Sequence, residues 1–221
     1  MSEETNVAKP SVIGMITSPV QQFKRLKERP FILPAMLIVV ITMALGTALQ
    51  GLGEETPELE GAGSTTFIIV ILAVVTVILA IIITMLGILI MSAIHMLVAK
   101  IATSPVSFKQ LFSMNTYVFV ISALGLLVNG IAASIIGVEY PGMEFTSLGS
   151  LVNNPGDMSA IAGIWDSIEV FSIWGYIITA IGLQIVAGFS KKMAWSVVVV
   201  IFLLTIMIEL MSSALAGIGG V

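Results

Sequence analysis

The chain has 221 residues, of which 57% are hydrophobic and only 10% are charged, and its formal net charge is −4. A soluble domain carries about a quarter charged residues, so this composition excludes an ordinary water-soluble protein and indicates a membrane protein. The chain has no Cys, which excludes disulfides, thiol nucleophiles and thiolate metal sites.

Residues 1–30 precede the first long apolar run and are polar, with Pro10, Pro19 and Pro30 interrupting them. This stretch lacks the apolar core of a cleavable signal peptide, so the first apolar run is expected to act as the insertion signal. We predict that residues 1–30 form a cytoplasmic tail with a short amphipathic helix, and that its first ten residues are disordered.

Five apolar runs are long enough to cross a membrane, which requires about 20 residues each. Backbone groups in hydrocarbon must be hydrogen-bonded within the segment, so the runs are expected to be helices. The second run is about 46 Å long at about 1.5 Å per residue, and it should therefore tilt, bend near Gly87 or project into the cytoplasm. The predicted spans are 31–49, 67–97, 117–137, 170–189 and 195–215, followed by a short outer tail, 216–221.

The charges alternate along the chain. All nine Lys and Arg residues lie within 9–29, 100–109 and 191–192, whereas the loops at 50–66 and 138–166 have none and carry Glu and Asp instead. Cytoplasmic loops are enriched in Lys and Arg. The predicted fold is therefore an all-α, polytopic bundle of five transmembrane helices in the cell membrane, with the N-terminus in the cytoplasm and the C-terminus outside.

Two cytoplasmic segments resemble each other: Thr17–Leu26 and Thr103–Leu111. In each, Ser can cap a helix whose first residue is Pro, and apolar residues three apart lie beside Lys. We interpret both as short amphipathic helices on the inner membrane face, with their lysines toward anionic lipid; alternatively, Ser-Pro is only a common helix start. The candidate contacts with lipid or a partner are Pro19, Phe23, Lys24, Leu26, Pro105, Phe108, Lys109 and Leu111.

The outer loop, 138–166, contains turn signals at 140–142 and 153–157. The apolar stretches beside them form either short interfacial or re-entrant helices or a plain structured loop. Within the spans, small residues recur at four-residue spacing, which either lets helices approach closely or reflects ordinary composition. These pairs are Ala44 and Ala48, Gly130 and Ser134, Ala133 and Gly137, and Ser213 and Gly217.

Ionisable groups inside membrane spans are costly and are candidates for function. Glu209 lies within the outer third of the fifth span, Asn129 lies at a similar depth in the third, and Glu169 begins the fourth. Together they form either a proton- or ligand-coupled polar cluster or a set of packing hydrogen bonds. His95 is the only histidine and cannot form a transition-metal site alone, so we expect it to pack or contact lipid near the cytoplasmic interface.

The sequence contains no His-Glu-x-x-His, Gly-x-Ser-x-Gly or phosphate-loop signature. No basic domain suited to nucleic acid is present. We therefore expect a protein that is not an enzyme, with no cofactor and no nucleic-acid partner.

Two cytoplasmic stretches carry a family pattern: Gly14–Pro19, Phe23 and Arg29–Pro30 before the first span, and Ala99–Ile101, Ser107–Phe112 and Tyr117 before and at the start of the third. Through these residues the chain resembles bacterial Yip-domain proteins from about Ser11 onward. The resemblance implies a five-span membrane protein without enzymatic activity that acts through partners. Eukaryotic relatives work in vesicle trafficking with small GTPases, for which the short N-terminal segment here offers no clear platform.

Two functional hypotheses follow. The resemblance favours a scaffold or accessory factor for a membrane complex, such as an ABC-type exporter or a stress-response system, with the lipid bilayer, a membrane-protein partner or further copies of the chain as its contacts. The alternative is a small transporter or channel that uses Asn129, Glu169 and Glu209.

Overall fold

The computed structural model describes residues 8–53, 65–138, 143–152 and 160–219. Those residues form helices and connecting turns, with a single isolated antiparallel bridge between Ser147 and Glu169. The helices are α1 (Val12–Thr17), α2 (Pro19–Glu28), α3 (Leu33–Gly53), α4 (Thr65–Ile101), α5 (Phe108–Ile136), α6 (Gly149–Val152), α7 (Ala160–Asp166), α8 (Val170–Ile185) and α9 (Lys191–Gly219).

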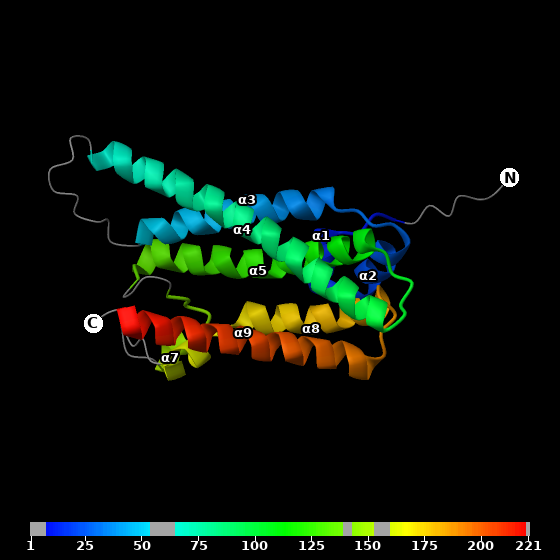
Figure 1. The fold of residues 1–221 in the computed structure, drawn as a ribbon. Helices are drawn as coiled ribbons and strands as arrows, with labels where there is room; N and C mark the ends of the chain where they lie inside the picture. Colours follow the sequence, from blue (N-terminus) through cyan, green and yellow to red (C-terminus); the bar gives the residue numbers. More distant parts are fainter. Residues whose placement is uncertain (1–7, 54–64, 139–142, 153–159, 220–221) are drawn as a thin grey trace.

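Helix α5 is the centre of the bundle. It packs against α3 and α4 on one side and α8 on the other, and α9 packs on α8 and α7 (Figure 1). Its many buried residues include polar ones such as Ser113, Asn115 and Thr116. A helix that is buried on several sides places its small and polar residues at helix contacts. There, neighbouring helices can approach the small residues and hydrogen-bond the polar ones, which lipid tails cannot do.

The closest packing joins α3 to α5 through small residues. A Cβ at Gly130 would collide with the backbone oxygen of Gly46, and one at Gly53 would collide with that of Ala133. The contact ends where Val138 N donates to Gly53 O (3.2 Å). Of the small-residue pairs seen in the sequence, Gly130 and Ala133 are thus used for close approach, whereas Ala48 is exposed.

Helix α4 is the longest element and the most exposed. Its 37 residues span about 55 Å, and it lies diagonally across the other helices (Figure 1). The helix is continuous through Gly87, so its excess length is accommodated by tilt and by extension beyond its neighbours.

In the part of the chain that the structure describes, four helices are long and apolar enough to cross a membrane: α3, α4 from Phe67, α5, and α9 as far as Ile208. Helix α8 is also apolar but has only 16 residues, about 24 Å. It ends at Ile185, four residues before the predicted limit of the fourth span, and the chain then turns through Gly188, whose φ is +71°. Helices α5 and α9 extend beyond the predicted third and fifth spans, α5 by nine residues at its start.

The outer loop contains two short helices, α6 and α7. Leu148 N donates to Ile168 O (2.8 Å) and Val170 N to Thr146 O (3.3 Å), so the stretch before α6 is paired with the start of α8. Helix α7 packs against α9. The second turn signal, at 153–157, and the first, at 140–142, lie outside the described residues.

Candidate functional site

Helices α1 and α2 form a compact unit before the first span. Ser11 caps α1 by accepting from Gly14 N (3.2 Å), and its own backbone N donates to Gln22 Oε1 on α2 (2.8 Å). Ser18 and Pro19 occupy the predicted N-cap and first helical positions of α2, but the Ser18 side chain makes no capping hydrogen bond. Helix α1 was not predicted, because its six residues are too few to show an apolar period.

The apolar face of α2 is buried in the protein. Phe23 and Leu26 have no exposed surface. A Cβ on Gly182 of α8 would lie 3.0 Å from Phe23 Cζ and 2.9 Å from Met114 Sδ, so the glycine makes room for the Phe23 ring between α5 and α8. The predicted contact of this face with lipid or a partner is wrong for Phe23 and Leu26, because helices of the bundle already cover them.

The second segment is not a separate amphipathic helix. Pro105 precedes the helical residues, and α5 begins at Phe108 with Ser107 as its N-cap. The cap is a capping box: Ser107 Oγ accepts from Gln110 N (3.3 Å), and Gln110 Oε1 accepts from Ser107 N (2.8 Å). The Ser-Pro pair at 104–105 predicts Ser104 as the cap, but the Ser-x-x-Gln pattern that begins three residues later, at Ser107, sets the start of α5. Leu111 is fully buried and is therefore no contact residue either.

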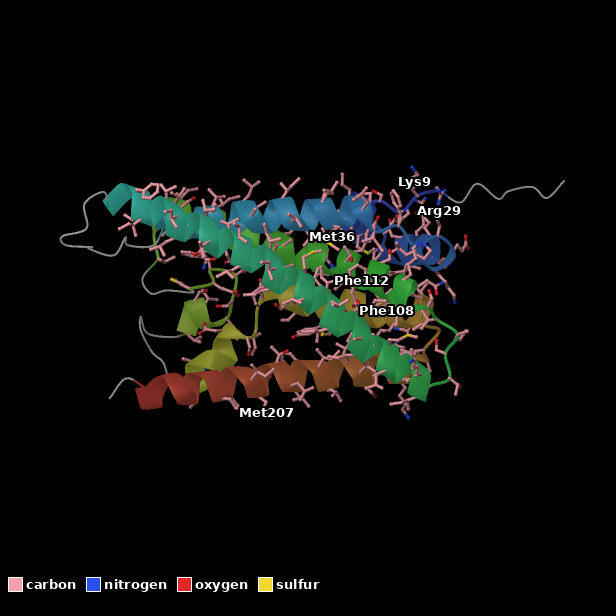
Figure 2. The ribbon with its side chains drawn as sticks, turned by 45° about the horizontal axis from the view of Figure 1, so that its top comes forward. Lys9, Arg29, Met36, Phe108, Phe112 and Met207 are labelled. Atoms are coloured by element: carbon pink, nitrogen blue, oxygen red, sulfur yellow. The ribbon has the colours of Figure 1, made fainter. Side chains whose placement is uncertain are left out.

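All nine basic residues lie at one end of the molecule, which we call the basic end. Figure 1 places the last turn of α4 and the first turns of α5 and α9 at the end where α1 and α2 pack. Lys24 and Lys109 are exposed there, as is 40% of Phe108. Figure 2 shows Lys9 and Arg29 at this end too, and Lys9 Nζ lies 5.3 Å from the centre of the Phe31 ring.

Hydrogen bonds between segments far apart in the sequence fix the basic end. Gln110 Nε2 donates to Lys27 O (2.6 Å), Ser104 Oγ to Ala187 O (2.5 Å) and Phe31 N to Ser113 Oγ (3.2 Å). The first bond joins α2 to α5, and the second joins the α4–α5 loop to the α8–α9 loop; their four residues line a cavity of about 480 Å³. The third bond ties the α2–α3 linker to α5. Lys27 is the one charged side chain among the residues that line this cavity.

The polar residues predicted near the outer side are only partly brought together. Asn129 Oδ1 accepts from Thr146 N (3.1 Å), and Thr146 Oγ1 donates to Glu169 Oε1 (2.7 Å). The Glu169 carboxylate also accepts from the backbone N of Phe171 (2.9 Å) and of Ser172 (2.6 Å), so it is the N-cap of α8. Asn129 and Glu169 therefore join through Thr146, which the sequence interpretation missed because it lies in the loop outside any span.

Glu209 lies on α9, but its side chain is outside the described residues. A link between Glu209 and the other two members of the predicted cluster therefore stays a prediction. The described residues contain no group of three or more His, Asp or Glu that could hold a metal ion.

A second buried polar group surrounds His95. Asn115 on α5 joins His95 Nδ1 (3.1 Å) to Ser92 Oγ (3.0 Å), and Ser92 Oγ donates to Ile88 O (2.6 Å). His95 and Ser92 have no exposed surface, and Asn115 is 3% exposed. The expected packing role fits this geometry, but the expected lipid contact is wrong, because the ring is enclosed between α4 and α5. Asn115 lies 20 residues from His95 and 23 from Ser92, on another helix, so no short-range pattern in the sequence connects the three residues.

Comparison with known proteins assigns the class of this helical membrane protein. The sequence matches the Yip1 domain over residues 13–213, and the chain belongs to that family. It is 34% identical to "Membrane protein YknW" of Bacillus subtilis (strain 168) over an alignment of 224 residues, which covers 98% of this chain and 95% of the relative. No solved structure matches the chain significantly.

Proposed function

We propose that this protein is a non-enzymatic, five-span member of the Yip1 family that serves as a scaffold or accessory factor for a membrane complex in the cell membrane, such as an ABC-type exporter. The observation that supports this proposal best is the construction of the basic end. Its exposed groups, Lys24, Phe108 and Lys109, lie on helices that long-range hydrogen bonds hold in place. A preorganised surface loses little conformational freedom on binding, which favours partner recognition.

The orientation belongs to the same proposal. With α8 as the fourth crossing, the basic end and the α6–α7 loop lie on opposite sides of the membrane, and the positive-inside rule favours the cytoplasm for the basic end. Helix α8 lies beside the longer α5 and α9 in Figure 1, so the short helix is shielded from lipid along much of its length. A membrane thins locally around a short span at modest cost.

The transporter alternative has weaker support. Glu169 is 5% exposed and accepts three hydrogen bonds, two of them from the backbone of its own helix. A carboxylate in that position stabilises the start of α8, and releasing it to bind a proton or ligand would leave several buried donors unpaired.

The proposal is tested by purifying the tagged protein from its own host in a gentle detergent, with quantitative mass spectrometry of the proteins that accompany it. The wild type should retain a stoichiometric membrane partner, and the double substitution Lys24→Glu with Lys109→Glu should lower its recovery about tenfold, because both exposed cations change sign. The double substitution Lys191→Glu with Lys192→Glu, a charge reversal of the same size at the exposed start of α9, should keep the partner. Recovery of the tagged chain without a partner, as a homo-oligomer, would contradict the proposal.

A further inference from the structure

A second cavity lies inside the bundle, away from the basic end. Its volume is about 200 Å³, and residues of α4, α5, α8 and α9 line it. It contains the His95 ring, whose Nε2 is buried and has no hydrogen-bond partner among the described residues. A buried polar atom without a partner costs about 1–3 kcal/mol, so this nitrogen is positioned at the expense of stability.

The hydrogen bonds behind His95 fix which nitrogen carries the proton. Ser92 Oγ donates to Ile88 O and so accepts from the Asn115 amide nitrogen. The amide oxygen of Asn115 therefore points toward His95 Nδ1, and because this oxygen can only accept, Nδ1 must donate. In the neutral ring, Nε2 is then left as an acceptor without a partner, on a residue that lines the cavity.

The other cavity groups with fixed roles are also acceptors. Thr179 Oγ1 donates to Gly175 O (2.8 Å), and Thr205 Oγ1 donates to Ile201 O (3.1 Å) while accepting from Tyr176 Oη (3.3 Å). With their protons engaged, these hydroxyl oxygens offer lone pairs to the cavity. Ser172 adds a hydroxyl that can rotate into either role.

The lining residues carry no formal charge, and most of the remaining wall is apolar, from side chains such as Met91, Val118 and Phe119. An ammonium group would lack the anionic partner that its burial requires, and a phosphate would lack a cationic partner. The volume corresponds to about seven water molecules at about 30 Å³ each, which suits a group of a few heavy atoms rather than a larger metabolite.

We propose that this cavity binds a small neutral polyol head, of the size of glycerol, in which one hydroxyl group donates to His95 Nε2 and another to Thr179 or Thr205. The same chemistry is offered by a membrane-embedded monoacylglycerol and by free glycerol. The lining residue Ser122 is exposed on α5, so a lipid-borne head has a way to the cavity from the bilayer. This inference does not depend on the scaffold proposal.

The test uses the full chain in nanodiscs of phosphatidylcholine, because the head group of this lipid has no hydroxyls. The probe is a photoactivatable monoacylglycerol. Labelling should be saturable and should map to α4, α5 or α8, and a probe with both hydroxyls converted to methyl ethers should label at least tenfold less. If unlabelled monoolein competes and free glycerol does not, the site binds the lipid. If free glycerol competes, the site binds the soluble polyol.

Two substitutions and a matched control complete the test. His95→Phe should weaken probe binding about tenfold, and Thr179→Val about threefold, because each removes one acceptor. Thr84→Val is the control: Thr84 is 7% exposed, as is Thr179, and donates to a carbonyl of its own helix (2.8 Å), but it lies outside the cavity. Any one of three results would overturn the proposal. They are equal labelling by the methyl-ether probe, labelling that neither saturates nor is reduced by glycerol, and unchanged binding in His95→Phe.

Discussion

At the residue scale, Glu169 closes the start of α8 with both of its carboxylate oxygens, which together accept three hydrogen bonds. Glu169→Ala should lower the free energy of unfolding by about 2 kcal/mol, because two backbone N–H groups and the Thr146 hydroxyl lose their acceptor. The midpoint of SDS-induced unfolding measures this change. Glu28→Ala, which removes an exposed carboxylate at the end of α2, should have no measurable effect, and equal effects of the two substitutions would contradict the capping role.

Asn115 allows a second prediction at this scale, because it serves two partners at once. Asn115→Ala leaves the His95 Nδ1–H without an acceptor, whereas Asn115→Ala combined with His95→Phe leaves no such donor. The double substitution should therefore cost at least about 1 kcal/mol less than the sum of the two single ones in the same unfolding measurement. Additive costs would show that the ring and the amide do not depend on each other.

Individual polar residues could be recognised from the sequence, but their partners could not. Asn129 and Glu169 were identified because polar groups in or beside a span are conspicuous. Thr146 and Asn115, which complete the two hydrogen-bond groups, look ordinary in the sequence, since their roles arise from contacts across 17 to 23 residues.

At the element scale, the glycine contact of α3 with α5 predicts opposite effects of one substitution at two positions. Gly130→Ala should lower the free energy of unfolding by about 2 kcal/mol, because the new methyl group meets the backbone of α3. Gly51→Ala, on α3 where nothing lies within 4 Å of the new Cβ, should leave stability unchanged or raise it by up to about 1 kcal/mol. Destabilisation of similar size at both positions in SDS titration would show that close approach is not the cause.

Burial of the α2 apolar face leads to another prediction at this scale. Phe23→Ala should lower the free energy of unfolding by about 3 kcal/mol, because the ring fills space between α5 and α8. Val20 lies on the outer side of the same helix and is 47% exposed, so Val20→Ala should lower the free energy of unfolding by at most about 0.5 kcal/mol. If Phe23→Ala changed only the binding of anionic vesicles and not stability, α2 would lie on the membrane surface as the sequence pattern first indicated.

The helices with a long apolar pattern could be predicted, whereas short or locally capped ones could not. The 3.6-residue period of α2 indicates an amphipathic helix but does not tell whether lipid or protein covers its apolar face. The start of α5 was misplaced because two serines three residues apart compete as caps, and the capping box with Gln110 decides for Ser107.

At the scale of the whole molecule, the sorting of charge and the lengths of the helices both bear on how the chain crosses the membrane. The basic residues gather at one end of the bundle, which the alternation of charged segments in the sequence predicts. The count of crossings depends on α8, whose 16 residues are fewer than the roughly 20 of an ordinary span. Sequence alone could not set this length, because the apolar run continues to Phe189 while the helix ends at Ile185.

The most direct test places a single cysteine on either side of α8 in this cysteine-free chain. Leu151→Cys lies before α8 at a position that is 80% exposed, and Lys191→Cys lies at the exposed start of α9. A membrane-impermeant maleimide should label Leu151→Cys in intact cells and Lys191→Cys only after permeabilisation, because α8 separates the two positions. Labelling of both from the same side would show that α8 does not cross the membrane, and the reverse pattern would show that the basic end faces outward.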